Sequence, residues 1–140
     1  MIPLKDDNPT HSTPIVTYII IGICVVVFLL ELSSPYYKTG AIFYSWGVIP
    51  ASLIHGVPIP DEIYRVPPTA TLITSMFMHG GFMHLIGNML YMWIFADNIE
   101  DEIGKVKFII FYLLSGIAAA LTQVFLNTES MIPMVGASGA

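Results

Sequence analysis

The sequence predicts an all-α membrane protein, a polytopic helical bundle with three complete membrane-spanning helices and the start of a fourth. Hydrophobic residues make up 55% of the 140 positions, and the mean hydropathy is +0.74. Charged residues make up only 11%, whereas a soluble domain carries roughly 25%. The uncharged positions form long continuous stretches. The net charge of −5 leaves no basic surface for a nucleic acid.

Residues 14–32 form the first predicted span. The stretch from Pro14 to Leu30 contains no charge, and with its flanks it is long enough to cross a hydrocarbon core about 30 Å thick. Pro14 suits the first turn of a helix, where a missing N–H costs no hydrogen bond. A signal peptide is the alternative, but Lys5-Asp6-Asp7 is not a basic leader and no small-residue cleavage motif follows. We therefore expect residues 1–13 to be a cytoplasmic tail.

Two further spans are predicted at residues 80–96 and 106–127. The uncharged stretch 66–96 is too long for one span and begins with prolines, so its first part should be an approach segment. The third span carries small residues that allow close helix packing in lipid. A fourth span should begin at about residue 136. We therefore expect residues 14–140 to be part of a larger membrane domain, and the chain to be a fragment.

The connections between the spans differ in character. Residues 33–68 are rich in proline and tyrosine and contain Trp46, which predicts an ordered loop at the membrane interface. Residues 97–107 predict a short polar turn, with Gly104 at a position of positive φ. Lys105 and Lys107 place this turn in the cytoplasm by the positive-inside rule, although two basic residues of the long loop oppose this orientation. The N-terminus is then cytoplasmic.

The most distinctive polar group in an apolar segment is Ser138. It lies between glycines in Gly136-Ala137-Ser138-Gly139, which would let a substrate backbone approach its hydroxyl. Free N–H groups near a helix start could bind a developing oxyanion there. The same pattern is a common packing motif of membrane helices, and it is not the Gly-x-Ser-x-Gly elbow of soluble hydrolases. On this pattern alone, Ser138 could be either a nucleophile or a small residue that allows helix packing.

His84 and Asn88 are four residues apart, so they share one face of a helix. Polar side chains in an apolar span face protein or a water-filled cavity. There, both could donate hydrogen bonds to a negative substrate oxygen. The alternative is a structural role, in which both bond to a neighbouring helix.

His79 precedes His84 by five residues, which places the two rings about 140° apart on a regular helix. The glycines between them could bend the chain and bring the rings closer. A metal site would need further ligands from His55 or from Asp61 and Glu62, and this spacing matches no metal motif. We therefore predict a structural role for His79 and expect neither a metal nor a cofactor.

Taken together, three blocks of this sequence resemble the rhomboid intramembrane serine proteases. The blocks are the His-x4-His-x3-Asn pattern within residues 78–90, the turn at residues 97–104, and the Gly-x-Ser-Gly motif. The resemblance covers roughly residues 46–140. It implies a six-helix core and these roles: Ser138 as nucleophile, His84 and Asn88 in oxyanion stabilisation, Gly136 in the oxyanion pocket, and His79, Glu100 and Gly104 as structural residues.

The resemblance also implies that the general base is a histidine on the sixth helix, beyond residue 140. A serine hydroxyl needs an adjacent base, so we expect residues 1–140 alone to be inactive. The full-length protein is expected to cleave transmembrane substrates near the outer face of a bacterial inner membrane. Two departures from the family pattern are Trp46-Gly47, where many members have Trp-Arg, and Ala96, where many have glycine.

Two other functions remain open. A non-catalytic rhomboid-like protein could bind client transmembrane helices without cleaving them. A small channel or transporter subunit could use His79, His84 and Asn88 as polar groups of a pore, but this function leaves the Gly-x-Ser-Gly motif unexplained. The expected partners are transmembrane proteins and the lipid bilayer, and not a nucleic acid.

Overall fold

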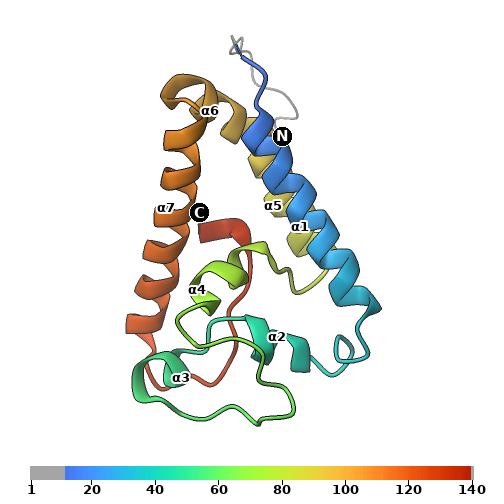
Figure 1. Cartoon of the computed structure of the whole chain (residues 1–140), viewed down its shortest axis with the longest axis vertical. Coiled ribbons are helices and arrows are strands. Elements are labelled where there is room, and N and C mark those ends of the chain that lie inside the picture. Colours follow the sequence, from blue (N-terminus) through green and yellow to red (C-terminus); the bar gives the residue numbers. More distant parts are fainter. Residues whose placement is uncertain (1–11, 140) are drawn as a thin grey trace.

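The computed structural model describes residues 12–139, so the predicted tail at residues 1–13 lies almost wholly outside the described residues (Figure 1). The helices are α1 (Ile15–Ser33), α2 (Ala41–Trp46), α3 (Pro50–His55), α4 (Thr71–Thr74), α5 (Phe82–Tyr91), α6 (Asp97–Ile103) and α7 (Lys105–Leu126). Short 3-10 turns, η1 (Ser75–Phe77) and η3 (Ala137–Gly139), and a π-helical turn, η2 (Met92–Ala96), complete the regular structure. Residues 12–139 contain no strand beyond one isolated antiparallel bridge between Val48 and Met134.

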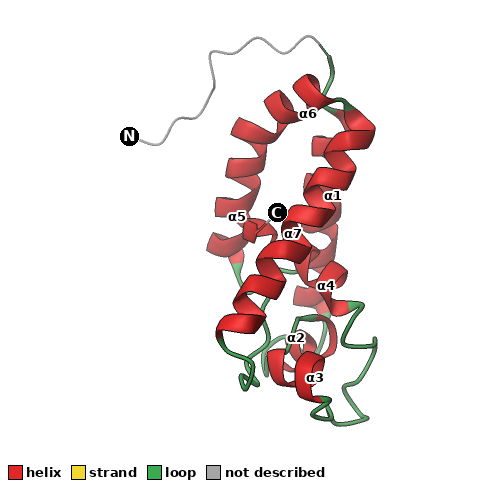
Figure 2. Cartoon of the chain, turned by 90° about the vertical axis from the view of Figure 1, so that its left-hand side faces the viewer, coloured by secondary structure: helices red, strands yellow, loops and turns green. Residues whose placement is uncertain are grey.

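The long helices diverge from one end of the molecule. Figure 1 shows α1 and α7 close together beside α6 and spreading apart toward the end that carries α2 and α3. Figure 2, turned by 90°, shows α2 and α3 again at the end away from α6. The C-terminal turn η3 lies at mid-height between the long helices. This placement puts the predicted serine between the long helices, on the α6 side of the layer formed by α2 and α3.

The core is built on one face of α1. Its buried apolar residues recur every four positions, as a single helix face requires: Val16, Ile20, Cys24 and Phe28. They form one cluster with Leu85 of α5 and with Phe108 and Tyr112 of α7. Large apolar side chains cover the outward faces of α1 and α7, and such extended apolar surfaces fit a lipid environment.

Two of the predicted spans correspond to single helices. Among residues 12–139, α1 and α7 are long and apolar enough to cross a membrane, and they match the predicted spans 14–32 and 106–127. The N-cap of α1 is Pro14, which confirms the predicted helix start. The predicted span 80–96 is instead composed of α5 and the π-helical turn η2.

The predicted turn at residues 97–107 is largely wrong. The chain continues as α6 to Ile103, and it changes direction only at Gly104, which has φ of +84°. The predicted positive φ at Gly104 is therefore confirmed. Because α7 begins at Lys105, the connection is a single residue, where a left-handed conformation favours glycine.

The long loop 33–68 is ordered, as predicted. It contains α2 and α3, and Val48 and Ile49 between them are buried. The backbone N–H groups of Val48 and Ala51 donate to the carbonyls of Met134 and Ser130, both at 3.0 Å. These bonds fasten the loop to the segment that leads into the Gly-x-Ser-Gly motif, and so fix the approach to the predicted serine.

Candidate functional site

The structure brings Gly136 against the two polar residues of α5. A Cβ atom at Gly136 would lie 2.6 Å from Nε2 of His84 and 3.5 Å from Nδ2 of Asn88. The φ of Gly136 is +126°, and its N–H donates to the carbonyl of Ser75 at 2.8 Å. The imidazole and the amide therefore both point at Gly136, and the imidazole leaves no room there for a side chain. Only the family resemblance implied this grouping, because His84 and Asn88 are about 50 residues from Gly136.

His84 has a defined orientation. Its Nδ1 accepts a hydrogen bond from the backbone N–H of Gly80 at 3.3 Å, and its Nε2 points toward Gly136. The side-chain Nδ2 of Asn88 is buried and has no hydrogen-bond partner among the described residues. A buried N–H group without a partner costs free energy, so this amide donor is available to a bound group.

Ser138 lies in η3 (Ala137–Gly139) and is exposed to two cavities. One has a volume of about 400 Å³ and is also lined by Asn88. The other has a volume of about 220 Å³ and is also lined by Ser75 and Gln123. Ser138 therefore stands between a space shared with the amide donor and a second, more polar space where water could be held.

The glycine after Ser138 is required by packing. A Cβ atom at Gly139 would lie 2.5 Å from Cβ of Ala119 on α7. Both residues must be small for η3 to approach α7 this closely. The small residues of the third span were predicted to allow close packing, and here Ala119 contacts the candidate site itself.

His79 lies beside His84 and not on the same helix. Because α5 begins only at Phe82, the glycines before it turn the chain, and the two imidazole rings pack edge to face with centroids 5.3 Å apart. His55, in contrast, contacts Glu129 at 2.8 Å. No group of three or more metal-ligating side chains occurs in the described range 12–139.

Sequence reasoning missed Glu31 as a residue near this site. Its side chain is only 2% exposed, and both carboxylate oxygens accept the backbone N–H of His79 at 3.4 Å. Glu31 lies three residues after Phe28, on the buried face of α1. A charged residue on the core face of an otherwise apolar helix was the available signal.

Burial makes His79 a poor proton acceptor. Its side chain is fully buried, and neither ring nitrogen has a hydrogen-bond partner among the described residues. Burial, followed by the charge of neighbouring His84, lowers the pKa of His79 from 6.5 to about 4. His79 is therefore neutral near pH 7.

This shift predicts a loss of stability in acid. The folded protein binds the His79 proton less tightly than the unfolded chain, so stability falls as the pH drops below 6.5 and the loss levels off below about 4. The shift corresponds to about 3 kcal/mol.

We expect the Tm of the full-length protein in detergent to fall more between pH 7 and pH 4.5 than the Tm of His79→Gln. His55→Gln, at an exposed histidine, is the matched control. Equal losses in wild type and His79→Gln would contradict the prediction.

Two apolar helices of membrane-spanning length around a buried polar cluster are typical of a helical membrane protein. Residues 60–140 match the family described as the rhomboid domain. Because this match covers more than half of the chain, the chain belongs to the rhomboid family, whose members are generally serine proteases of the membrane.

The curated relatives include proteases and an inactive protein. The chain is 36% identical over 84 residues to "Inactive rhomboid protein 1" of Drosophila melanogaster, covering 60% of this chain and 5% of that protein. It is 30% identical over 131 residues to "Rhomboid protease GluP" of Bacillus subtilis (strain 168), covering 93% of this chain and 23% of that protein. It is 26% identical over 108 residues to "Rhomboid protease GlpG" of Salmonella typhi, covering 77% and 34%.

The chain thus spans about a third or less of the length of each of these relatives. No solved structure matches it.

Proposed function

We propose that the full-length protein is an intramembrane serine endopeptidase that cleaves transmembrane substrates, with Ser138 as its nucleophile. The observation that carries the proposal is the convergence of Nε2 of His84 and Nδ2 of Asn88 on Gly136, the first glycine of the Gly-x-Ser-Gly motif. A side chain at position 136 would collide with the imidazole of His84, so glycine lets His84 lie this close to the motif. Two donors that converge on a space near a serine support an oxyanion site.

The reaction follows the general scheme of serine hydrolases. Oγ of Ser138 attacks the carbonyl carbon of the scissile peptide bond and gives its proton to a general base. The carbonyl oxygen becomes negative and accepts hydrogen bonds from His84 and Asn88. The C–N bond then breaks, the base returns the proton to the leaving amine, and water hydrolyses the acyl-enzyme.

The proton acceptor is assigned by the family pattern and not by residues 1–140. His84 cannot fill both roles, because its Nε2 serves as a donor to the oxyanion and its Nδ1 is occupied by Gly80. His79 is buried and has a lowered pKa, which makes it a weak base at neutral pH. The proposed base is therefore a histidine of a later helix, and the proposed dyad forms only in the full-length protein.

The membrane orientation that we propose follows from the distribution of lysine residues. With Lys105 and Lys107 in the cytoplasm, the end of the molecule that carries α2 and α3 faces outward, and Ser138 lies below this outer surface. The cavity of about 220 Å³ beside Ser75 and Gln123 offers polar groups that could hold the hydrolytic water. A bacterial inner membrane with the substrate site toward the outside is the location that we propose.

Covalent labelling tests the proposal. Full-length protein in lipid vesicles is treated with a fluorophosphonate probe, and cleavage of a transmembrane peptide is followed in parallel. We expect wild type to be labelled and Ser138→Ala to lose both labelling and cleavage. Ser115→Ala changes a serine of α7 that lines neither cavity and should behave as wild type. Labelling that persists in Ser138→Ala would exclude this serine as the nucleophile.

A second function is supported by the similarity to a relative named as inactive. In this alternative the protein binds transmembrane helices without cleaving them. Two results would favour it: an unlabelled wild-type protein that still binds a transmembrane peptide, and a mass near 15.4 kDa for the protein from its native membrane. A larger mass together with labelling of Ser138 would favour the protease.

A further inference from the structure

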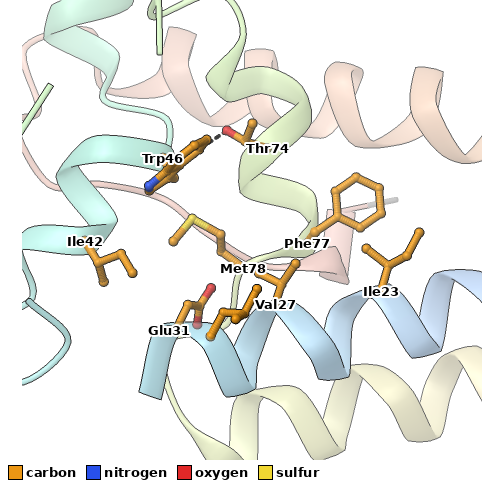
Figure 3. A pocket seen from close by; sticks show the side chains of 9 residues that line it. Ile23, Val27, Glu31, Ile42, Trp46, Thr74, Phe77 and Met78 are labelled. Atoms are coloured by element: carbon orange, nitrogen blue, oxygen red, sulfur yellow. Dashed lines mark hydrogen bonds between the residues drawn. The ribbon is translucent and has the colours of Figure 1, made fainter. Parts of the chain in front are cut away.

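Glu31 is a buried acid that the proposed reaction does not use. It lies in the last turn of α1, and its side chain is 2% exposed. Within residues 12–139 it forms no salt bridge, and its carboxylate contacts the backbone N–H of His79 through both oxygens. Figure 3 shows this carboxyl group rising from α1 toward the segment that carries Met78. Burying an acid is costly unless it has partners, so its contact with His79 calls for an explanation.

The segment that Glu31 holds is intrinsically loose. His79 is followed by Gly80 and Gly81 before α5 begins at Phe82. Two consecutive glycines have a wide choice of backbone conformations. Without an attachment on the α1 side, this segment would sample many conformations. The contact from Glu31 fixes the peptide N–H of His79, and the packing of the His79 ring against His84 fixes its side chain.

The next N–H group along the chain is the one that bonds His84. Gly80 N–H donates to Nδ1 of His84, and an imidazole nitrogen that accepts a hydrogen bond carries no proton. In the neutral ring the proton then sits on Nε2, which faces the space beside Gly136. The opposite tautomer would present a lone pair to that space and would repel an oxyanion.

We infer that Glu31 is a positioning residue, which acts through the His79–Gly80 backbone to keep His84 in the Nε2–H tautomer. The tautomer itself follows from the contacts, and only its catalytic value rests on the proposed function. Glu31 does not touch the space beside Gly136 directly. Its effect passes through one backbone segment, from α1 to the first turn of α5.

Nitrogen NMR of full-length protein labelled with ¹⁵N-histidine tests this inference in detergent micelles at pH 7.5. The signals of His84 are identified by their loss in His84→Asn. In wild type we expect a protonated Nε2 and an unprotonated Nδ1. Glu31→Gln keeps an acceptor oxygen and should retain this pattern. Glu31→Leu removes the acceptor and should give the averaged signals of two exchanging tautomers.

Control variants separate positioning from general loss of stability. Cys24→Ala truncates a fully buried residue on the same face of α1 and should leave the His84 signals unchanged. If Glu31→Leu does not fold, two variants of Gly80 test the same backbone contact to His84. Gly80→Ala keeps the N–H, and its Cβ would lie at an ordinary 3.9 Å from Nδ1, whereas Gly80→Pro removes the donor. Only Gly80→Pro should alter the tautomer.

Activity gives an independent second measurement. In Glu31→Leu we expect kcat for a transmembrane peptide to fall by about 10- to 100-fold with little change in KM, since an oxyanion donor acts mainly in the transition state. A protonated Nδ1 in wild type, or unchanged His84 signals in Glu31→Leu, would overturn the inference. An unlabelled Ser138 in wild type would instead overturn the proposed function, and the NMR result would still stand.

Discussion

Replacing Gly136 with alanine is expected to abolish both probe labelling of Ser138 and peptide cleavage. The added Cβ would lie 2.6 Å from Nε2 and 2.7 Å from Cε1 of His84, closer than side-chain carbons approach other atoms. The φ of +126° is also one that L-residues rarely adopt, at a cost of about 1–3 kcal/mol. The methyl group would displace the imidazole of His84, and losing even one oxyanion donor costs about 10²- to 10³-fold in kcat.

Two glycine controls separate these causes in the same assays. Gly56→Ala has a milder backbone conflict, with φ of +66° in the left-handed helical region, and its Cβ would meet no atom within 4 Å. It should lose some stability and keep its activity. Gly81→Ala lies near His84 and also has open space around its Cβ, so its activity should be preserved. Labelling and kcat within about threefold of wild type in Gly136→Ala would contradict the proposed oxyanion site.

The spacing of residues along the chain predicts only the local part of the candidate site. His84 and Asn88 share a face because their spacing fits one helical turn, and their convergence on Gly136 was expected only through the family resemblance. The position of His79 could not be derived from helical periodicity. Its ring reaches His84 because α5 starts after the two glycines. Where a helix starts within a Gly-Gly segment depends on tertiary contacts that the local sequence does not contain.

Residues 97–103 show a different limit of prediction from sequence. Their density of acidic side chains predicts a solvated turn, yet they form α6 with Glu100 turned inward and only 1% exposed. The partners of Glu100 are backbone N–H groups at the start of α1, more than 80 residues earlier. Likewise, Glu31 appeared to be no more than the end of an apolar stretch. Both acids are buried against backbone donors, and backbone donors leave no signature in a sequence.

Removing the carboxylate of Glu100 is expected to cause the largest loss of stability in this part of the protein. Glu100 accepts hydrogen bonds from the N–H groups of Val16 and Thr17 at 3.0 and 2.8 Å, and from the hydroxyl of Thr17 at 2.8 Å. These N–H groups belong to the first turn of α1, where no side chain of the helix caps them and where the helix dipole favours a negative charge. Glu100 therefore caps α1 from a distant helix.

In Glu100→Ala the buried donors at the start of α1 would lose all of these partners. At about 1–3 kcal/mol for each unsatisfied group, the free energy of unfolding should fall by about 3–5 kcal/mol. Glu100→Gln keeps one acceptor oxygen but turns an NH₂ group toward other donors, so its loss should be intermediate. Glu102→Ala, at an exposed position of the same helix, should change stability by less than about 0.5 kcal/mol. The measurement is thermal unfolding of the full-length variants in detergent. If Glu100→Ala were as stable as Glu102→Ala, α1 would not depend on this cap.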